Sequence, residues 1–402
     1  MVTLADIEAA RDRIAGGVYY SPCVESIPLS QLTGAHVYCK LDYLQRTGSF
    51  KERGARNALL QLSPEQRRRG VIAASAGNHA QGIAYHAKLL GIPTTVVMPV
   101  FAALIKVTNC RQFGADVVLH GADLTEARAH AGEIAAREGL TFIHPFDNID
   151  VIAGQGTMGL EILEQTPDVE AIVVPVGGGG LIAGIGTAVK AKAPGVEIVG
   201  VEPDRAACLT EALAQDAPTT VPLSHTLADG LAVGKLGDAP FAIVKRVVDR
   251  VVTVDEAMIA LAILRLIELE KSVVEGAGAA PLAAFLAGRL AMLEGKRVVL
   301  VLAGGNIDSS ALGRIIDVGL VADGRLCRFT VTISDRPGGL ARLAEIIAAA
   351  GASIKEIVHD RAFAGPDLSA VRVVCVAETT GHAHVERLHR ALHAAGLPVD
   401  AW

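Results

Sequence analysis

The stretch Thr47-Gly48-Ser49-Phe50-Lys51-Glu52-Arg53-Gly54-Ala55 places a lysine between an aromatic ring and a helix-like segment, residues 55–62. Burying a lysine is unfavourable because its ammonium group loses water, and the same loss lowers the pKa of the amine. A neutral amine in such a place can attack a carbonyl carbon and form a Schiff base. The stretch therefore makes Lys51 a candidate nucleophile; the alternative is an exposed lysine at the start of a helix.

The composition limits the kinds of protein that the rest of the chain can encode. Its 402 residues, 51% of them hydrophobic, suffice for a large two-lobed core and a small domain. A net charge of -6 without a basic stripe gives no reason to expect nucleic acid as a partner. No Cys-x-x-Cys spacing occurs, which favours reduced thiols in the cytoplasm over disulfides or a zinc site; the cysteines are Cys23, Cys39, Cys110, Cys208, Cys327 and Cys375.

Neither the first residues nor the longest uncharged segment of the chain indicates a membrane protein. The first residues contain early acidic side chains and no apolar run, so we expect no signal peptide. Residues 171–189 are uncharged and about as long as a bilayer span. Because Pro175 and four glycines interrupt them, we expect a strand, a glycine loop and a helix instead of a membrane segment.

Short β-branched runs alternate with longer amphipathic runs over the first three quarters of the chain. Strands are predicted at residues 37–41, 71–74, 94–98, 116–120, 172–174, 198–201 and 298–302. Helices are predicted at residues 6–14, 80–90, 103–113, 124–137 and 156–164. This alternation is typical of an α/β protein with mostly parallel sheets covered by helices, here in two lobes. Ligands of such sheets bind beyond the carboxyl ends of the strands.

The pattern changes near Gly324. Strands are predicted at residues 326–334, 354–360, 369–378 and 398–401, with helices at 340–350 and 384–395. The order βαββαβ is that of a ferredoxin-like unit. We therefore expect a catalytic domain over residues 1–322 and a smaller domain over residues 326–402.

The first glycine-containing loop that follows a predicted strand consists of Ser75, Ala76, Gly77, Asn78 and His79. Successive backbone amides at a helix start form an anion site, which suits a carboxylate, and Asn78 adds a side-chain donor. His79 is a candidate acid or base, although a helix-start histidine that only caps or packs is the favoured interpretation.

Two further loops of this kind follow later strands. Four glycines allow the backbone to wrap a phosphate closely, and a flexible turn is the alternative; the residues are Gly177, Gly178, Gly179, Gly180 and Leu181. The third loop is Ala303-Gly304-Gly305-Asn306. We expect all three loops on one sheet edge. A reactive lysine with a phosphate site and a carboxylate site indicates pyridoxal 5'-phosphate acting on an amino acid.

Residues 45–51, 75–82, 177–181 and 304–308, in this order, resemble the threonine ammonia-lyases, also called threonine dehydratases. These are fold-type II pyridoxal phosphate enzymes of the tryptophan-synthase-like family. The resemblance extends from the N-terminus to about Asp317. The sequence Asp335-Arg336-Pro337-Gly338-Gly339-Leu340 resembles an ACT domain, a ferredoxin-like amino-acid sensor.

The resemblance implies a role for each candidate residue. Lys51 would carry the Schiff base and remove the α-proton, Phe50 would pack against the cofactor, and Asn78 would hydrogen-bond its phenolic oxygen. Glu275 would lie near the ring and Ala303 next to its nitrogen. The glycine loop, residues 177–181, would bind the phosphate, and residues 75–79 the substrate carboxylate. The implied reaction converts L-threonine to 2-oxobutanoate and ammonia, and L-serine to pyruvate.

Three positions depart from the family pattern. Ala303 cannot hydrogen-bond the pyridine nitrogen, where relatives place serine, threonine or cysteine. Ala76 replaces the serine that protonates the opposite face in serine racemases, so racemisation is disfavoured. Cys208 replaces an aspartate that binds a divalent cation together with the equivalents of Glu202 and Ala206. Because Mg²⁺ and Ca²⁺ prefer oxygen ligands, we expect no tight metal site there.

The ACT resemblance implies a homo-oligomer and an amino-acid effector, for which isoleucine and valine are candidates. A tail that only oligomerises is an equally good interpretation. Another β-eliminating enzyme, such as a hydroxyaspartate ammonia-lyase, is the enzymatic alternative. A non-catalytic amino-acid sensor is the alternative from another class, and Lys51 argues against it. A nucleotide-binding oxidoreductase would need a Gly-x-Gly-x-x-Gly motif with an acidic residue about twenty positions later, and no convincing instance occurs.

Overall fold

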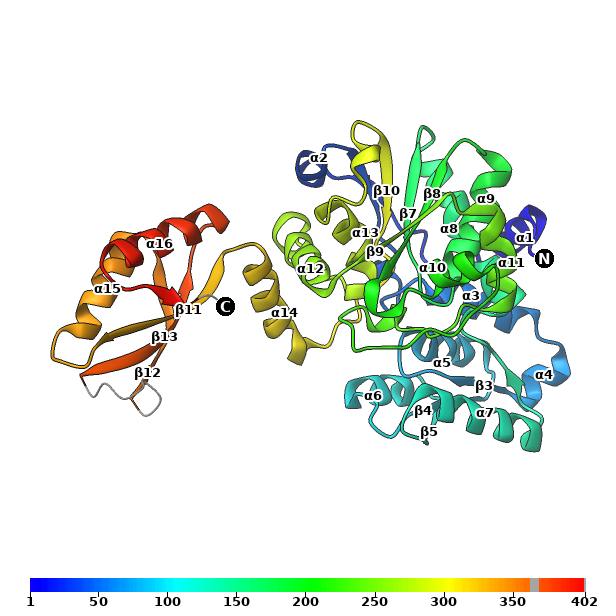
Figure 1. The fold of residues 1–402 in the computed structure, drawn as a ribbon. Coiled ribbons are helices and arrows are strands. Elements are labelled where there is room, and N and C mark those ends of the chain that lie inside the picture. Colours follow the sequence, from blue (N-terminus) through cyan, green and yellow to red (C-terminus); the bar gives the residue numbers. More distant parts are fainter. Residues whose placement is uncertain (362–368, 401–402) are drawn as a thin grey trace. The chain divides into compact units, whose positions relative to one another are not determined.

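The computed structural model describes residues 1–361 and 369–400. The chain forms two compact units, Met1–Asp308 and Ser309–Trp402. The first unit contains two separate sheets, each covered by helices, and these define its two lobes (Figure 1). The α/β class and the two-lobed organisation predicted for this part of the chain are confirmed.

The large lobe is built on a six-stranded sheet in the order β1-β2-β10-β7-β8-β9. Only the pairing of β1 with β2 is antiparallel. The strands are β1 (Cys23–Glu25), β2 (His36–Lys40), β7 (Ala171–Pro175), β8 (Glu197–Pro203), β9 (Arg250–Val254) and β10 (Arg297–Val301). Helices α8 (Ile149–Gln165) and α9 (Gly180–Lys192) lie on one side of this sheet and α13 (Gly276–Leu286) on the other (Figure 1).

The small lobe is built on a four-stranded, fully parallel sheet in the order β5-β4-β3-β6. The strands are β3 (Val71–Ala74), β4 (Thr94–Met98), β5 (Asp116–Leu119) and β6 (Thr141–Phe142). Helices α5 (Asn78–Leu90) and α6 (Leu104–Gln112) cover one face, and α7 (Leu124–Glu138) covers the other. Nearly every residue of β3 and β4 is buried, because helices cover both faces of the sheet; the polar side chains of these strands are the two threonines, Thr94 and Thr95, at the start of β4.

Helix α3 (Lys51–Gln61) packs against both α5 of the small lobe and α8 of the large lobe. The contact with α8 requires a glycine, because a Cβ on Gly154 would lie 2.6 Å from the carbonyl oxygen of Arg53. Helix α5 packs at ordinary distance, since a Cβ on Gly82 would lie 3.4 Å from the carbonyl carbon of Lys51. The start of α3, and with it Lys51, is therefore placed where the lobes meet.

The remaining elements of the first unit surround these layers. The helices are α1 (Leu4–Ile14), α2 (Ile27–Thr33), α4 (Pro64–Arg69), α10 (Cys208–Gln215), α11 (Asp238–Val247) and α12 (Glu256–Glu270). Short 3₁₀ helices are η1 (Asp42–Leu44), η2 (Asp204–Ala206), η3 (Asp229–Leu231) and η4 (Ala291–Leu293).

The second unit begins with α14 (Ser309–Ala322) and continues as a four-stranded antiparallel sheet with two helices. The elements are β11 (Leu326–Ser334), α15 (Gly339–Ala349), β12 (Ser353–Asp360), β13 (Ala370–Glu378), α16 (His382–Ala394) and β14 (Val399–Asp400). The sheet order is β12-β13-β11-β14, and side chains such as Phe329, Leu343 and Leu388 form its core. The order of elements is βαββαβ, as predicted; the last predicted strand position, Ala401, lies outside the described residues.

Most predicted strands are confirmed to within two residues, but two helices begin earlier than predicted. Helix α8 starts at Ile149 instead of Gly156, and α3 starts at Lys51 instead of Ala55. Residues 171–189 form a strand, a glycine loop and a helix, as expected. None of the helices in the described part of the chain combines the length and apolarity that a bilayer crossing requires.

Candidate active site

Lys51 begins α3 and is only partly exposed. Its Nζ donates a hydrogen bond to the carbonyl oxygen of Pro145, over 3.0 Å, and lies 5.0 Å from the ring centroid of Phe50. Burial lowers the pKa of the Lys51 amine to about 8, and the carboxylate of Glu275 opposes this shift. A useful fraction of the amine is therefore neutral, and hence nucleophilic, near neutral pH.

The four-glycine loop connects β7 to α9 in the large lobe. Gly179 adopts a left-handed conformation, with φ of 86°. A Cβ on Gly178 would lie 2.3 Å from the ring of Phe146, and one on Gly180 would lie 3.0 Å from the Phe146 carbonyl oxygen. Side chains are thus excluded from two of the four positions by contact with one phenylalanine.

The amides of this loop are available to an anion. Within the described residues, the backbone N–H groups from Gly177 to Ile182 donate to no protein acceptor, whereas Ala183 already donates to Gly179. Unpaired amides at the start of a thirteen-residue helix, together with its dipole, favour a phosphate. The loop therefore fits the phosphate of pyridoxal phosphate.

The loop of residues 75–79 connects β3 to α5 in the small lobe. The Gly77 amide donates to the Ser75 hydroxyl over 3.2 Å, and a Cβ on Gly77 would meet no atom within 4 Å. Across the part of the chain that the structure describes, the amides of Ala76, Asn78 and His79 have no protein acceptor. Open space beside free amides at a helix start suits a carboxylate.

His79 turns away from this space. Its side chain is buried, and Nε2 lies 3.0 Å from the carbonyl oxygen of Ile143, to which it donates. Burial, aided by the nearby charge of Lys51, lowers the pKa of His79 to about 3. The imidazole is therefore neutral, and the residue offers its backbone amide to the loop.

Asn78 links the two lobes. Its Nδ2 donates to Oε1 of Glu275 over 2.7 Å, and its Oδ1 accepts from Nδ2 of Asn306 over 2.9 Å. Asn306 also donates to the carbonyl oxygen of Thr47, which precedes Lys51. Burial, and secondarily the carboxylate of Asp229, raises the pKa of Glu275 to about 7. The side chains predicted near the cofactor ring thus belong to one hydrogen-bonded group.

The third glycine loop pairs with the residues that precede Lys51. The carbonyl oxygen of Ala303 accepts from the Phe50 amide over 2.9 Å, and Ser49 forms an isolated antiparallel bridge with Gly304. Ala303 is buried, and its methyl group offers no hydrogen bond. The loop therefore supports the Lys51 segment through its backbone.

The expectation that the three loops lie on one sheet edge is wrong. The loop of residues 75–79 follows β3 of the small-lobe sheet, whereas the loops after β7 and β10 belong to the large-lobe sheet. Contacts nevertheless bring them together: Lys51 bonds Pro145, the neighbouring Phe146 packs on Gly178, and Asn78 bonds Glu275. The site thus forms between lobes.

Several contributors to this site were not identified from the sequence. Pro145 and Phe146 carry no recognisable motif. Lys106 of α6 and Asp229 of η3 form a 2.8 Å ion pair between the lobes, beside Glu275. The role of Asn306 could have been inferred, because it stands in the third glycine loop and its side chain has both a donor and an acceptor.

Glu202 and Cys208 are engaged with the protein itself. The Glu202 carboxylate accepts from the amides of Leu209 and Thr210, over 2.6 and 2.9 Å, at the start of α10. The Cys208 thiol donates to the carbonyl oxygen of Gly177 over 3.3 Å. No cluster of three or more metal-ligating side chains occurs among the residues described.

Comparison with known proteins agrees with this geometry. Residues 14–304 match the family model described as "Pyridoxal-phosphate dependent enzyme". The L-threonine ammonia-lyase of Thermotoga maritima is 45% identical over 399 residues, which cover 99% of each chain.

Solved structures of similar proteins cover the first unit. The processed form of threonine deaminase isoform 2 from Solanum lycopersicum is 38% identical, with a TM-score of 0.74, over 78% of this chain and 86% of that one. Maize serine racemase is 35% identical, with a TM-score of 0.75, over 78% of this chain and 96% of that one. The chain therefore belongs to the family of pyridoxal-phosphate-dependent enzymes.

Proposed function

We propose that the protein is a pyridoxal-phosphate-dependent ammonia-lyase that converts L-threonine to 2-oxobutanoate and ammonia, and L-serine to pyruvate. The observation that carries the proposal is the Lys51 amine, whose pKa is lowered to about 8 where amide-rich loops from both lobes come together. The near full-length similarity to an L-threonine ammonia-lyase supports the choice of substrate.

Each candidate residue has a physical task in this reaction. The amides of Gly177, Gly178, Gly179, Gly180 and Leu181 hold the phosphate of the cofactor at the start of α9. Asn78 and Glu275 would hold its ring, and Phe50 would pack against it. The methyl group of Ala303 would offer the ring nitrogen no hydrogen bond. When bound, pyridoxal phosphate withdraws electrons from the substrate α-carbon and makes its proton acidic.

The substrate is oriented and deprotonated by groups of both lobes. The loop of residues 75–79 would hold its carboxylate through the free amides of Ala76, Asn78 and His79. Lys51 Nζ would hold the cofactor covalently and would also serve as the general base that accepts the proton of the substrate Cα. Loss of the β-hydroxyl and hydrolysis then give the 2-oxo acid and ammonia.

Three measurements test the proposal. Purified protein should form 2-oxobutanoate from L-threonine, and pyruvate from L-serine. Borohydride reduction should attach the cofactor to the peptide that contains Lys51, as seen by mass spectrometry. Lys51→Ala should lose both the attachment and the activity. A preference for 3-hydroxyaspartate over threonine would contradict the proposed substrate, and activity that survives Lys51→Ala would contradict the proposed mechanism.

We further propose that residues 326–402 form an ACT-like regulatory domain and that residues 1–322 form the catalytic domain. The βαββαβ order and the loop between β11 and α15 support this interpretation. In that loop Asp335 pairs with Arg361 over 2.8 Å, and a Cβ on Gly339 would lie 2.0 Å from the Ser334 carbonyl oxygen. Isoleucine or valine should change the turnover of the full chain, and Gly339→Ala should abolish that response. Equal turnover with and without both amino acids would contradict the regulatory role and would leave residues 326–402 with a role in assembly alone.

The same proposal includes a homo-oligomer in the cytoplasm. ACT-like units commonly pair, and all six cysteines are free, as is usual for proteins of a reducing compartment. Light scattering of the purified chain would test the first point, because a monomeric mass would contradict it.

A further inference from the structure

Two charged residues directly follow Lys51, and both reach back to the loop that precedes it. We call residues 42–50 the Lys51 loop. Arg53 binds Asp42, at the beginning of this loop, and Glu52 accepts the amide of Thr47 within it. The side chains of all three charged residues are buried. The loop is therefore closed at two points by residues of the helix that Lys51 begins.

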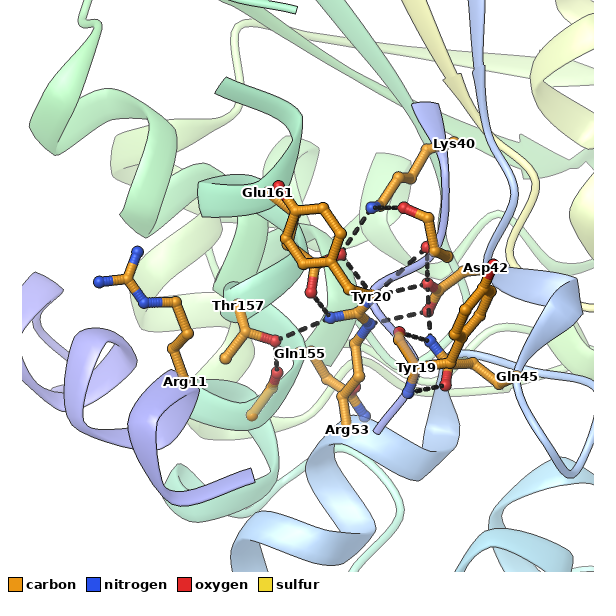
Figure 2. A network of polar contacts seen from close by, with 12 residues as sticks. Arg11, Tyr19, Tyr20, Lys40, Asp42, Gln45, Arg53, Gln155, Thr157 and Glu161 are labelled. Carbon is orange, nitrogen blue, oxygen red and sulfur yellow. Dashed lines mark hydrogen bonds and ion pairs between the residues drawn. The ribbon is translucent and has the colours of Figure 1, made fainter. Parts of the chain in front are cut away.

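Arg53 uses every one of its five N–H groups (Figure 2). Nε and Nη2 donate to the two oxygens of Asp42, over 2.9 and 2.7 Å. Nη1 and Nη2 donate to the two oxygens of Glu161, over 2.6 and 2.8 Å, and Nη1 also donates to the Thr157 hydroxyl over 3.1 Å. The guanidinium group thus holds η1 and α8 in two bidentate contacts, which a lysine ammonium cannot reproduce.

The charges of this cluster balance. Lys40, whose Nζ donates to Glu161, supplies the second positive charge beside Arg53, and Asp42 and Glu161 supply the two negative charges. Burial raises the pKa of Asp42, but Arg53, together with Lys40 and Ser21, outweighs burial and keeps that pKa below its ordinary value. A buried group of ions with all partners satisfied specifies geometry more than it adds stability.

The charged cluster is not among the groups that shift the pKa of the catalytic amine. Burial and the Glu275 carboxylate account for the pKa of Lys51. Any effect of Arg53 on Lys51 must therefore be transmitted through the position of the backbone.

The geometry of α3 provides that transmission. Residues two apart in a helix project about 200° from each other, so Arg53 and Lys51 lie on nearly opposite sides of α3. The Arg53 side is held against α8, where a Cβ on Gly154 would already lie 2.6 Å from the Arg53 carbonyl oxygen. Holding one side of the helix sets its rotation and thus the direction in which Lys51 projects.

Glu52 forms the second contact with the Lys51 loop. One of its oxygens accepts the Thr47 amide, and the other lies 3.0 Å from Nε2 of the buried His86 on α5. The start of α3 is thereby attached to the small lobe as well as to the large one.

We propose that Arg53 and Asp42 are positioning residues for Lys51: their bidentate contact closes the Lys51 loop, sets the rotation of α3 and so holds the amine where it binds the cofactor. The inference rests on the proposed role of Lys51, and neither residue takes part in the chemistry.

The experiment measures how fast cofactor-free protein binds pyridoxal phosphate covalently, as a function of pH, with borohydride trapping and mass spectrometry. Arg53→Met is compared with Lys40→Met. Both substitutions remove one positive charge from the same cluster, but only the first breaks the contact with the Lys51 loop. Thermal unfolding of each variant is recorded in parallel.

Arg53→Met should slow covalent binding about 10- to 100-fold, which is typical when a reacting group is misplaced. Its pH profile should also move upward, because a displaced Lys51 amine regains water and its pKa returns toward that of an ordinary lysine. Lys40→Met should unfold at a lower temperature but keep the rate and the pH profile of the unaltered protein. Arg53→Lys should resemble Arg53→Met.

Asp42→Asn breaks the same contact and preserves the shape of the side chain, so it decides the question if Arg53→Met does not fold. Unchanged rates and profiles in folded Arg53 and Asp42 variants would overturn the proposal, as would equal changes in Lys40→Met. Covalent binding that persists in Lys51→Ala would instead overturn the proposed role of Lys51, which separates the two failures.

Discussion

Asn78 of α5 donates a hydrogen bond to Glu275 at the start of α13 over 2.7 Å, and this bond joins the small lobe to the large one. Glu275 is buried there, and its backbone amide donates to the carbonyl oxygen of Gly304 over 3.1 Å. A carboxyl group in this setting is easier to protonate than one in water, and this has consequences for stability.

Stability of the cofactor-free protein should depend on pH through Glu275. Its pKa rises from 4.5 to about 7, chiefly by burial, so the folded state binds more protons than the unfolded state between these values. The raised pKa of Glu275 therefore stabilises the folded state by roughly 3 kcal/mol below pH 4.5. This stabilisation is lost as the pH rises to about 7. Glu275→Gln should flatten this dependence of unfolding free energy on pH, as measured by urea unfolding, whereas Glu8→Gln, at a half-exposed ion pair with Lys192, should not. If the free energy of unfolding of Glu275→Gln depends on pH as in the unaltered protein, another group is responsible for the dependence.

The ion pair of Lys106 and Asp229 should tune the same titration. Asp229 raises the pKa of Glu275, and Lys106 lowers it. Asp229→Asn should therefore lower the pH at which the stabilisation by protonated Glu275 is lost, and Lys106→Met should raise that pH. Shifts in the same direction would contradict this account. The pair itself should add less than about 1 kcal/mol, since Asp229 is largely exposed.

Lys51 is required for the proposed activity, but it should lower the free energy of unfolding of the cofactor-free protein. Its pKa falls from 10.5 to about 8 by burial, so at lower pH the folded state contains a buried ammonium. Below pH 8, Lys51→Met should stabilise the cofactor-free protein by up to about 3 kcal/mol while abolishing deamination. The gain should vanish as the pH rises through 8 to 10.5, because the native lysine then loses its proton. Urea unfolding at several pH values measures both effects, and a gain that does not depend on pH would point to packing instead.

The glycine loop should tolerate no methyl group at Gly178. Because the added Cβ would lie 2.3 Å from the Phe146 ring, Gly178→Ala should displace the loop and its amides. Affinity for pyridoxal phosphate should fall at least about tenfold, equivalent to 1.4 kcal/mol. Gly195→Ala in the same lobe is the control, since its Cβ would meet nothing within 4 Å. Fluorescence titration with the cofactor gives both affinities, and equal values would show that the loop adapts.

Parallel strands were the most predictable part of the fold. The runs that form β3 and β7 are apolar on both faces, β4 differs only by two β-branched threonines at its start, and all three are bounded by glycine or proline, so sequence alone indicates them well. The start of α8 was not predictable, because Gly154 and Gly156 resemble helix breakers. In the structure these glycines allow contact with Arg53 and Gly184 on neighbouring helices.

The reactive lysine and the glycine loops were predictable because each is a local pattern. Their distribution over two sheets was not, since nothing local indicates that β10 pairs with β2 instead of continuing the small-lobe sheet. The buried cluster of Lys40, Asp42, Arg53 and Glu161 was also missed. Charged residues usually lie at the surface, and these partners are as many as 121 positions apart.

The pairing of β2 with β10 determines when this protein can fold during its synthesis. His36–Lys40 leaves the ribosome long before its partner Arg297–Val301, so the six-stranded sheet must wait with β2 incompletely covered. The four-stranded sheet is complete once Phe142 has emerged and can assemble first. Early strands that wait for a late neighbour are exposed to aggregation, so chaperones that cover β2 until residues 297–301 have emerged would benefit this chain most.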